Sequence, residues 1–143
     1  MIVRTIGELI KDQTLVTISR QATVSDACKL MSDEDVGALV VMDEIGMCGI
    51  LSERDVIRRC EAKGAPANLM RVDAIMTLKP ETVTPTQSLA DALRLMIEGD
   101  FRHLPVVGSD GTVMGMVSKS DIPTEFCLMV ERFSAYQARH AAA

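Results

Sequence analysis

Apolar residues recur at helical spacing in two segments of the chain. From Val24 to Met31 and from Leu89 to Met96 they fall at positions i, i+3, i+4 and i+7, which predicts one amphipathic helix in each place. The patterns Thr23-x-x-Asp26 and Ser88-x-x-Asp91 have the form of capping boxes, so we expect the helices to begin there. The aspartates then have a structural role, because the first turn of a helix favours negative charge.

Short apolar runs after each helix predict pairs of strands. A turn that ends in glycine separates the runs of each pair, and Asp-Gly is a strong hairpin signal. A second helix is expected from about Glu53 to Lys63, because Gly64 and Pro66 form a helix stop. The runs are Ala38–Met42 with Met47–Leu51 and Leu104–Val107 with Val113–Val117, and shorter β-favouring stretches are Val16–Ser19 and Thr82–Thr84.

The order β-α-β-β-α occurs twice, because the second half of the chain repeats the first. The run Thr17–Gly46 recurs 65 positions later as Thr82–Gly111, and Gly49–Val56 corresponds to Gly115–Ile122. Each half of the 143 residues is marginal alone, so we expect the halves to share a core. The predicted organisation is repeat 1 at 6–64, a linker at 65–71, repeat 2 at 72–125 and a C-terminal amphipathic helix and tail at 126–143.

The C-terminal segment departs from the repeat. After Pro123, which a first helical turn tolerates, an amphipathic stripe continues for longer than one repeat needs. It supports two interpretations: an edge helix that covers its own core, and a helix that binds a second copy or another partner. The stripe consists of Ile122, Phe126, Met129, Val130, Phe133 and Tyr136 or Gln137.

Composition and charge restrict the function classes. The formal net charge of −5 and the pI near 5.0 argue against a nucleic-acid partner, because the phosphate backbone would repel this chain. No apolar run is long enough to cross a bilayer, and Met1–Arg4 lead into polar residues without a signal-peptide pattern. We therefore expect a cytoplasmic protein with no membrane partner.

The cysteines and histidines form no metal or redox pattern. The four cysteines lack C-x-x-C spacing, so we expect reduced core residues, with a metal or redox role as the alternative. Two scattered histidines, His103 and His140, do not strengthen the case for a metal. The cysteines are Cys28, Cys48, Cys60 and Cys127.

One doubled motif at a strand-to-helix junction indicates a ligand site. Gly-hydrophobic-hydrophobic-Ser-x-x-Asp occurs at Gly49–Asp55 and again at Gly115–Asp121. A serine beside free backbone N–H groups suits a phosphate, and an aspartate one turn later can accept hydrogen bonds from a ribose diol. The same spacing also fits an ordinary capping box, so both interpretations stay open here. Catalysis has little support, because His103, the only histidine inside the repeats, precedes a buried strand and no catalytic serine or phosphate-loop motif occurs.

These features together resemble a tandem pair of cystathionine-β-synthase (CBS) domains, a Bateman module. The resemblance covers about Ile6 to Phe126 and is carried by the doubled element order, by both Gly-to-Asp motifs and by Phe101-Arg102-His103-Leu104-Pro105-Val106-Val107. The leads Ile6–Ile10 and Val72–Thr77 fit the segment that precedes each copy in the family. The resemblance implies an α/β (α+β) fold in which two repeats pack sheet to sheet about a pseudo-twofold axis, with ligand clefts between them.

The resemblance also implies roles for individual residues. In the family pattern an aspartate holds ribose, a serine or threonine lies near phosphate, backbone around the first strand meets adenine, and a basic residue of the partner repeat neutralises phosphate. Gly37 and Ala38 stand where repeat 2 has its basic pair, so the clefts are expected to be unequal, with the cation at Ser52 and Asp55 if the pair reaches across. The matching positions are Asp55 and Asp121, Ser52 and Ser118, Ile18 and Val83, and Arg102 with His103, together with the motif neighbours Arg54 and Lys119.

The implied function is regulation and not catalysis. Family members bind AMP, ADP, ATP, NAD(H) or S-adenosylmethionine, so we expect an adenosine-containing ligand in at least one cleft and no metal except Mg²⁺ with ATP. Such modules commonly pair, which implies a homodimer that passes ligand occupancy to a regulated protein. The alternative is a CBS pair that serves only as a dimerisation or scaffold element, with empty clefts.

Overall fold

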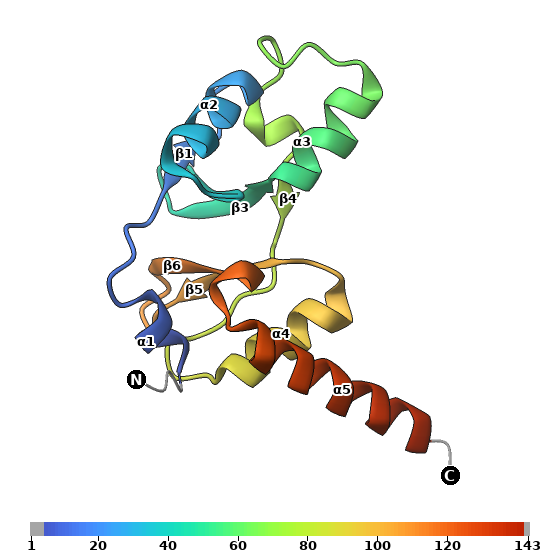
Figure 1. Ribbon diagram of the computed structural model, residues 1–143. Helices are drawn as coiled ribbons and strands as arrows, with labels where there is room; N and C mark the ends of the chain where they lie inside the picture. Colours follow the sequence, from blue (N-terminus) through green and yellow to red (C-terminus); the bar gives the residue numbers. More distant parts are fainter. Residues whose placement is uncertain (1–4, 142–143) are drawn as a thin grey trace. The chain divides into compact units, whose positions relative to one another are not determined.

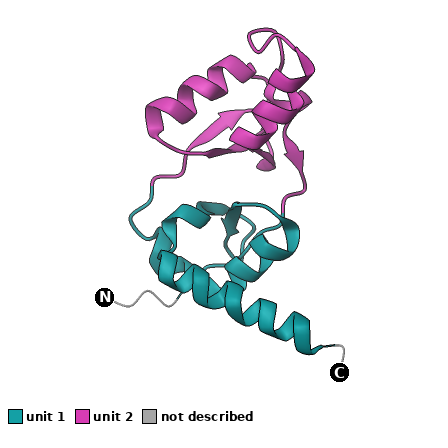
Figure 2. Ribbon diagram, turned by 45° about the vertical axis from the view of Figure 1, so that its right-hand side comes forward, with its two compact units in different colours: residues 1–13, 81–143 teal, residues 14–80 magenta. Residues whose placement is uncertain are grey.

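The computed structural model describes residues 5–141, which fold into a mixture of helices and strands, as predicted (Figure 1). Contacts divide them into two compact units: unit 1 comprises residues 5–13 and 81–141, and unit 2 comprises residues 14–80 (Figure 2). Met1–Arg4, where the sequence lacks a signal-peptide pattern, and the last two residues of the predicted tail lie outside the described residues.

Unit 2 is built on a four-stranded sheet in the order β1-β2-β3-β4. β1 is parallel to β2, whereas β2, β3 and β4 are antiparallel neighbours. Helices α2 and α3 lie on one face of this sheet (Figure 1). The elements are β1 (Thr17–Ser19), α2 (Val24–Glu34), β2 (Ala38–Met42), β3 (Met47–Ser52), α3 (Glu53–Arg59), the 3₁₀ turns η1 (Glu61–Lys63) and η2 (Val72–Ala74), and β4 (Thr77–Leu78).

Unit 1 has a smaller sheet, in which β5 (His103–Val107) pairs with β6 (Val113–Ser118). The stretch predicted as a further strand joins this sheet only through Val83, which forms a parallel bridge to Val106. The remaining elements of unit 1 are α1 (Ile6–Ile10), α4 (Leu89–Gly99), the 3₁₀ turn η3 (Lys119–Asp121) and α5 (Thr124–His140).

The repeated helix starts arise from the same local interaction. Each of the four Ser/Thr-x-x-Asp patterns forms a capping box. The aspartate carboxylate accepts a hydrogen bond from the backbone N–H of the serine or threonine three residues earlier. Helices α2 and α4 also end alike, at Asp35 and Asp100, both of which have a φ of 53°. The predicted capping boxes are therefore confirmed.

Each unit is completed by a segment from the other half of the sequence. Helix α1, in the lead of repeat 1, belongs to unit 1, and the lead of repeat 2, Val72–Thr77, belongs to unit 2. Both segments make the same backbone contact, because Ile6 N donates to Gln87 O (3.0 Å) and Val72 N donates to Ala22 O (2.8 Å). The compact units therefore follow boundaries that differ from those of the sequence repeats.

The residues predicted as a linker, 65–71, also form part of unit 2. Their carbonyl groups accept hydrogen bonds at the start of α2, where Val24 N donates to Met70 O (2.9 Å) and Ser25 N to Ala67 O (3.0 Å). These bonds satisfy N–H groups that a helix start leaves without an intrahelical partner.

Two separate hydrophobic clusters replace the single shared core that the sequence led us to expect. One cluster contains Ile6, Leu93 and Val117 of unit 1, and the other contains Val24, Leu51 and Val72 of unit 2. Each unit can build its own cluster because the lead from the other half of the sequence adds apolar residues, such as Ile6 in unit 1 and Val72 in unit 2.

The glycine of each Gly-to-Asp motif makes room for the completing segment. A Cβ at Gly49 would lie 2.6 Å from the Thr77 carbonyl oxygen, and one at Gly115 would lie 2.7 Å from Gln13 Oε1. In unit 2, β4 covers the edge of β3 with its own main chain. In unit 1 the Gln13 side chain takes this place, since its amide donates to Met116 O (2.8 Å) and accepts from Met116 N (2.7 Å).

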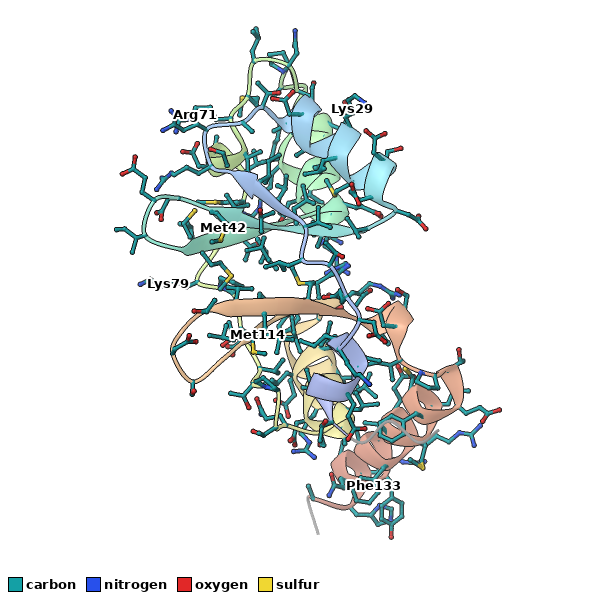
Figure 3. All side chains as sticks on the ribbon, turned by 90° about the vertical axis from the view of Figure 1, so that its left-hand side faces the viewer. Lys29, Met42, Arg71, Lys79, Met114 and Phe133 are labelled. Atoms are coloured by element: carbon teal, nitrogen blue, oxygen red, sulfur yellow. The ribbon has the colours of Figure 1, made fainter. Side chains whose placement is uncertain are left out.

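Helix α5 has one side that packs on unit 1 and one that does not. Cys127 is buried, and Phe126 and Val130 pack against the core of unit 1. Met129 and Phe133 are 57% and 60% exposed, and Phe133 projects from the helix (Figure 3). Of the predicted stripe, one part therefore covers its own core and the other is free for a partner.

The cysteines are free thiols, but only two of them are core residues. Cys60 and Cys127 are buried, whereas Cys28 and Cys48 are partly exposed. Partial burial raises the pKa of the Cys28 and Cys48 thiols, so both are protonated at neutral pH.

Replacing Gly49 with alanine should destabilise unit 2, because the new methyl group meets a main-chain carbonyl that is fixed by strand pairing. We expect the free energy of unfolding to fall by about 1–3 kcal/mol, the usual cost of overpacking. Gly115→Ala is the matched control: its methyl group meets the Gln13 and Ile10 side chains, which can move, so the loss should be smaller. Urea denaturation measures both, and equal losses would contradict this account.

Candidate functional site

The motifs Ser52–Asp55 and Ser118–Asp121 occupy corresponding places in the two units: each begins at the end of the second strand of a hairpin, beside the start of the first strand. We call these places corners. The Ser52 corner consists of Gly37, Ala38 and Ser52–Asp55 in unit 2, and the Ser118 corner consists of Arg102, His103 and Ser118–Asp121 in unit 1. In each, the serine is the cross-strand partner of the residue that begins the neighbouring strand. The residue after the serine donates its N–H to a carbonyl before that strand, at 3.0 Å in unit 2 and 2.8 Å in unit 1.

Asp55 of the Ser52 corner is already engaged inside its own unit. It is 7% exposed, and its carboxylate accepts hydrogen bonds from the Ser52 N–H (3.0 Å) and the Thr77 hydroxyl (3.2 Å). Arg59 Nε lies 3.8 Å from Asp55 Oδ1. Buried carboxylates require such partners, because an unpaired one is strongly disfavoured. This carboxylate therefore holds β4 against α3.

Asp121 of the Ser118 corner is exposed and has much of its hydrogen-bonding capacity free. Within residues 5–141, its carboxylate has one partner, the Ser118 N–H at 3.1 Å. An ionised carboxylate can accept about four hydrogen bonds. The Ser118 hydroxyl lies 2.9 Å from the Ser120 hydroxyl, which adds a second exposed polar group. The corner can therefore accept hydrogen bonds from a bound diol.

The charges of the two corners differ. Arg102 and His103 begin β5, whereas Gly37 and Ala38 occupy these positions in unit 2. The Arg102 guanidinium is exposed and makes no hydrogen bond or ion pair with the rest of the described chain. Directly after the motif serine, the Ser118 corner has the positively charged Lys119, whereas the Ser52 corner has the negatively charged Glu53. The Ser118 corner is therefore the better match for a phosphate.

Among the remaining predicted residues, Arg54 is partly buried in α3, and Ile18 and Val83 belong to sheet positions. Ile18 pairs with Val41 in β1 and packs against the core of unit 2. Val83 is 1% exposed, and both of its backbone polar groups are used: its N–H donates to Pro105 O (3.0 Å), and its carbonyl accepts from Val107 N (2.8 Å). The predicted contact of these backbones with adenine stays a prediction.

Sequence reasoning did not connect Thr77 or Glu131 with these corners. Thr77 lies in the lead of repeat 2, and its hydroxyl donates to Asp55. Glu131 lies in α5, and its carboxylate pairs with Lys119 at 2.9 Å. In the alignment of the two leads, Lys11 stands opposite Thr77. This difference was the available sign in the sequence that the two motif aspartates have different neighbours.

An ion-pair cluster near the end of β1 was also not predicted. Asp73 accepts hydrogen bonds from Arg20 Nε (3.1 Å) and Arg71 Nη2 (2.7 Å). Partial burial acts to raise the pKa of Asp73, but hydrogen bonds and charges from Arg71 and Arg20 outweigh it and hold the pKa below its usual 3.8. In unit 1 the corresponding residues are Pro85 and Gly7, so the cluster clamps unit 2 alone.

Neither a metal cluster nor a spanning helix occurs in the part of the chain that the structure describes. No group of three or more His, Cys, Asp or Glu residues there could hold a metal ion. None of the helices there is both long enough and apolar enough to cross a membrane.

The chain matches one family of known proteins in two places. The family model of the CBS domain matches residues 6–62 and again residues 72–124. The chain belongs to the CBS domain family. The mixed α+β fold, with its four-stranded and two-stranded sheets, matches solved pairs of CBS domains.

Known CBS proteins resemble the chain over most of its length. It is 35% identical to a putative signal-transduction protein with CBS domains from Burkholderia ambifaria, with a TM-score of 0.78 over 82% of this chain and 89% of that one. The CBS domain protein PAE2072 from Pyrobaculum aerophilum, solved in complex with AMP, is 26% identical, with a TM-score of 0.78 over 90% of this chain and 97% of that one.

A curated relative is longer than the chain. The mitochondrial CBS domain-containing protein CBSX3 from Arabidopsis thaliana is 38% identical over 105 residues, or 70% of this chain. The match spans half of the length of that relative.

The two aspartates should differ in their contribution to stability. Asp55→Ala should lower the free energy of unfolding by about 1–3 kcal/mol, because the Thr77 hydroxyl and the Ser52 N–H lose a charged acceptor. Asp121→Ala removes an exposed group with one contact and should change it by about 0.5 kcal/mol or less. Urea denaturation of both variants tests this expectation. A greater loss in Asp121→Ala would show that Asp121 is the structural member of the pair.

Proposed function

We propose that the protein is a regulatory module that binds an adenosine-containing nucleotide, AMP in the first instance, at the Ser118 corner. The observation that carries the proposal is the open carboxylate of Asp121, one turn from Ser118 and close to unpaired Arg102 in the fold of unit 1. The AMP complex of the relative from Pyrobaculum aerophilum supports the choice of ligand.

The chemistry of this ligand fits the groups of the corner. The ribose diol supplies two hydroxyl donors, and Asp121 is an acceptor that the protein leaves largely unused. The phosphate needs a cation, and an unpaired guanidinium is well suited to it. ADP, ATP and NAD(H) carry the same groups, with Mg²⁺ accompanying ATP. S-adenosylmethionine carries the diol without phosphate, so dependence on Arg102 distinguishes it from the nucleotides.

The Ser52 corner should bind such a ligand more weakly or stay empty. A ribose at Asp55 would have to displace the Thr77 hydroxyl from a carboxylate that is 7% exposed. Glu53 would also repel a phosphate there, Gly37 and Ala38 offer no cation, and Arg54 is partly buried and already has an interaction partner.

Asp121→Ala should weaken AMP binding by about 1.5–3 kcal/mol, or roughly 10- to 150-fold, the scale of lost hydrogen bonds to a charged group. Asp91→Ala is the matched control, since Asp91 forms the same capping box in the same unit, away from the corner. Calorimetry measures both affinities. Equal AMP affinity in wild type and Asp121→Ala would reduce the motif to helix capping.

Arg102→Ala should weaken the binding of AMP but leave that of adenosine nearly unchanged, because adenosine has no phosphate. We expect a loss of about tenfold for AMP, the lower end of the range for a charge-assisted hydrogen bond. The same calorimetric series supplies the adenosine control. Equal losses for both ligands would assign Arg102 to packing and not to phosphate recognition.

The alternative is a scaffold that binds no nucleotide. A thermal-shift panel with AMP, ADP, ATP, NAD, NADH and S-adenosylmethionine separates the two, because a ligand that binds only the native state raises its stability by about 2.7 kcal/mol at a hundredfold excess over Kd. A panel without any shift would favour the scaffold. Turnover of any of these compounds would instead favour an enzyme.

We further propose that the module is a homodimer whose interface includes α5. The exposed side of this helix carries large apolar residues, and a second copy related by a twofold axis can cover such a surface. A dimer of this kind is suited to pass ligand occupancy to a regulated protein. The residues are Leu128, Met129, Phe133 and Tyr136.

Phe133→Glu should shift the protein from dimer to monomer. A charge at the centre of an apolar interface costs about 2 kcal/mol or more, which is roughly a thirtyfold weaker dimer. Ala138→Glu adds the same charge on the side of α5 that carries Glu131 and Ser134, away from Phe133, and serves as the control. Truncation at Thr124 is less specific, because it also removes buried Cys127. Light scattering measures the mass, and a Phe133→Glu dimer as stable as the wild type would move the interface elsewhere.

A further inference from the structure

Lys119 lies within the Ser118 corner, but its side chain leaves the corner for α5. Its Nζ atom lies 2.9 Å from Glu131 Oε1, in an ion pair whose side chains are 27% and 39% exposed. Its backbone N–H donates to Arg102 O at 2.8 Å, so the start of this side chain is fixed beside the basic pair. One residue therefore touches both the proposed ligand corner and the C-terminal helix.

This ion pair is a distinctive link between the corner and α5. Within residues 5–141, no other ion pair joins a side chain of α5 to another element. Unit 2 has nothing comparable, since Glu53 occupies the corresponding position in its motif and no long helix follows α3. The lysine and its partner thus belong to the corner that has the open aspartate.

A bound phosphate would compete with Glu131 for the Lys119 ammonium group. Partly exposed ion pairs are weak, because water screens them and two long side chains lose freedom. A phosphate monoester carries about 1.5 to 2 negative charges at neutral pH, against one for a carboxylate, and forms charge-assisted hydrogen bonds. Lysine has a long flexible stem, so its head can change partner while its backbone stays in place.

We propose that Lys119 exchanges Glu131 for the ligand phosphate when a nucleotide binds, so that occupancy of the Ser118 corner releases the ion pair to α5. The inference rests on the proposed function, because it needs a phosphate at this corner. By linkage, the contact with α5 then opposes nucleotide binding to the same extent that the nucleotide opposes the contact. The exchange connects the ligand to the helix with the exposed apolar side.

The test compares the affinities of AMP and adenosine for the wild type and two charge variants by calorimetry. Glu131→Gln removes the competitor and should strengthen AMP binding by about two- to fivefold, the strength of an exposed ion pair. Adenosine affinity should not change, since it has no phosphate. Glu125→Gln removes the same charge from the first turn of α5, where Glu125 is exposed and is not the ion-pair partner of Lys119, and it should leave both affinities as in the wild type.

A second arm uses Lys119→Met, which keeps most of the side-chain stem and removes the charge. It should weaken AMP binding and leave adenosine unaffected, and Glu131→Gln should then have no further effect in the Lys119→Met background. A purely structural ion pair would change the binding of both ligands alike or of neither.

The outcomes separate this inference from the proposed function. A wild type that does not bind AMP contradicts the proposed function and the exchange together. AMP binding that depends on Asp121 but is not strengthened by Glu131→Gln contradicts the exchange alone. AMP binding strengthened by Glu131→Gln, with no change for adenosine and no gain without Lys119, supports it.

Discussion

The close approach of a distant segment to one strand of each hairpin is the constraint on which the structure depends. Gly49 lets the main chain at Thr77 lie against β3, and Gly115 lets Gln13 reach the edge of β6. The same close approach determines which hydrogen-bond partners the aspartates Asp55 and Asp121 have. Thr77 brings a hydroxyl to Asp55, whereas the segment that completes unit 1 brings no partner to Asp121 among the described residues. Packing and site chemistry therefore have one origin.

The repeat thus provides one scaffold with two chemical outcomes. Both corners have the same backbone hydrogen bond after the serine, and in both the aspartate carboxylate accepts from the serine N–H. The Ser52 motif continues into α3, whereas the Ser118 motif forms the short 3₁₀ turn η3. The Ser52 corner has a buried carboxylate that accepts from Ser52 and Thr77, and the Ser118 corner has an open carboxylate with basic neighbours. Only the second combines a free acceptor with an unpaired cation, Arg102. A single proposed site per chain follows from this division, and Lys119 relates that site to α5.

Local patterns predicted much of the fold, because the interactions behind them span a few residues. The capping boxes, both hairpins and the starts of α2 and α4 follow from neighbours in sequence. The exchange of segments did not follow, and neither did the two separate cores, because both depend on contacts between distant parts of the chain. For the same reason the motif residues were found but the state of Asp55 was not: its partner Thr77 lies 22 positions away.

The number of AMP molecules bound per chain tests the central claim, that the completing segment leaves one of the two aspartates open. Calorimetric titration of the full chain with AMP, at protein concentrations well above Kd, gives this number directly. The account predicts one AMP per chain, since Asp55 is occupied by Thr77 and Asp121 is not. Two equivalent AMP molecules per chain would show that engagement of Asp55 does not close its corner, and no binding would show that an open aspartate does not suffice.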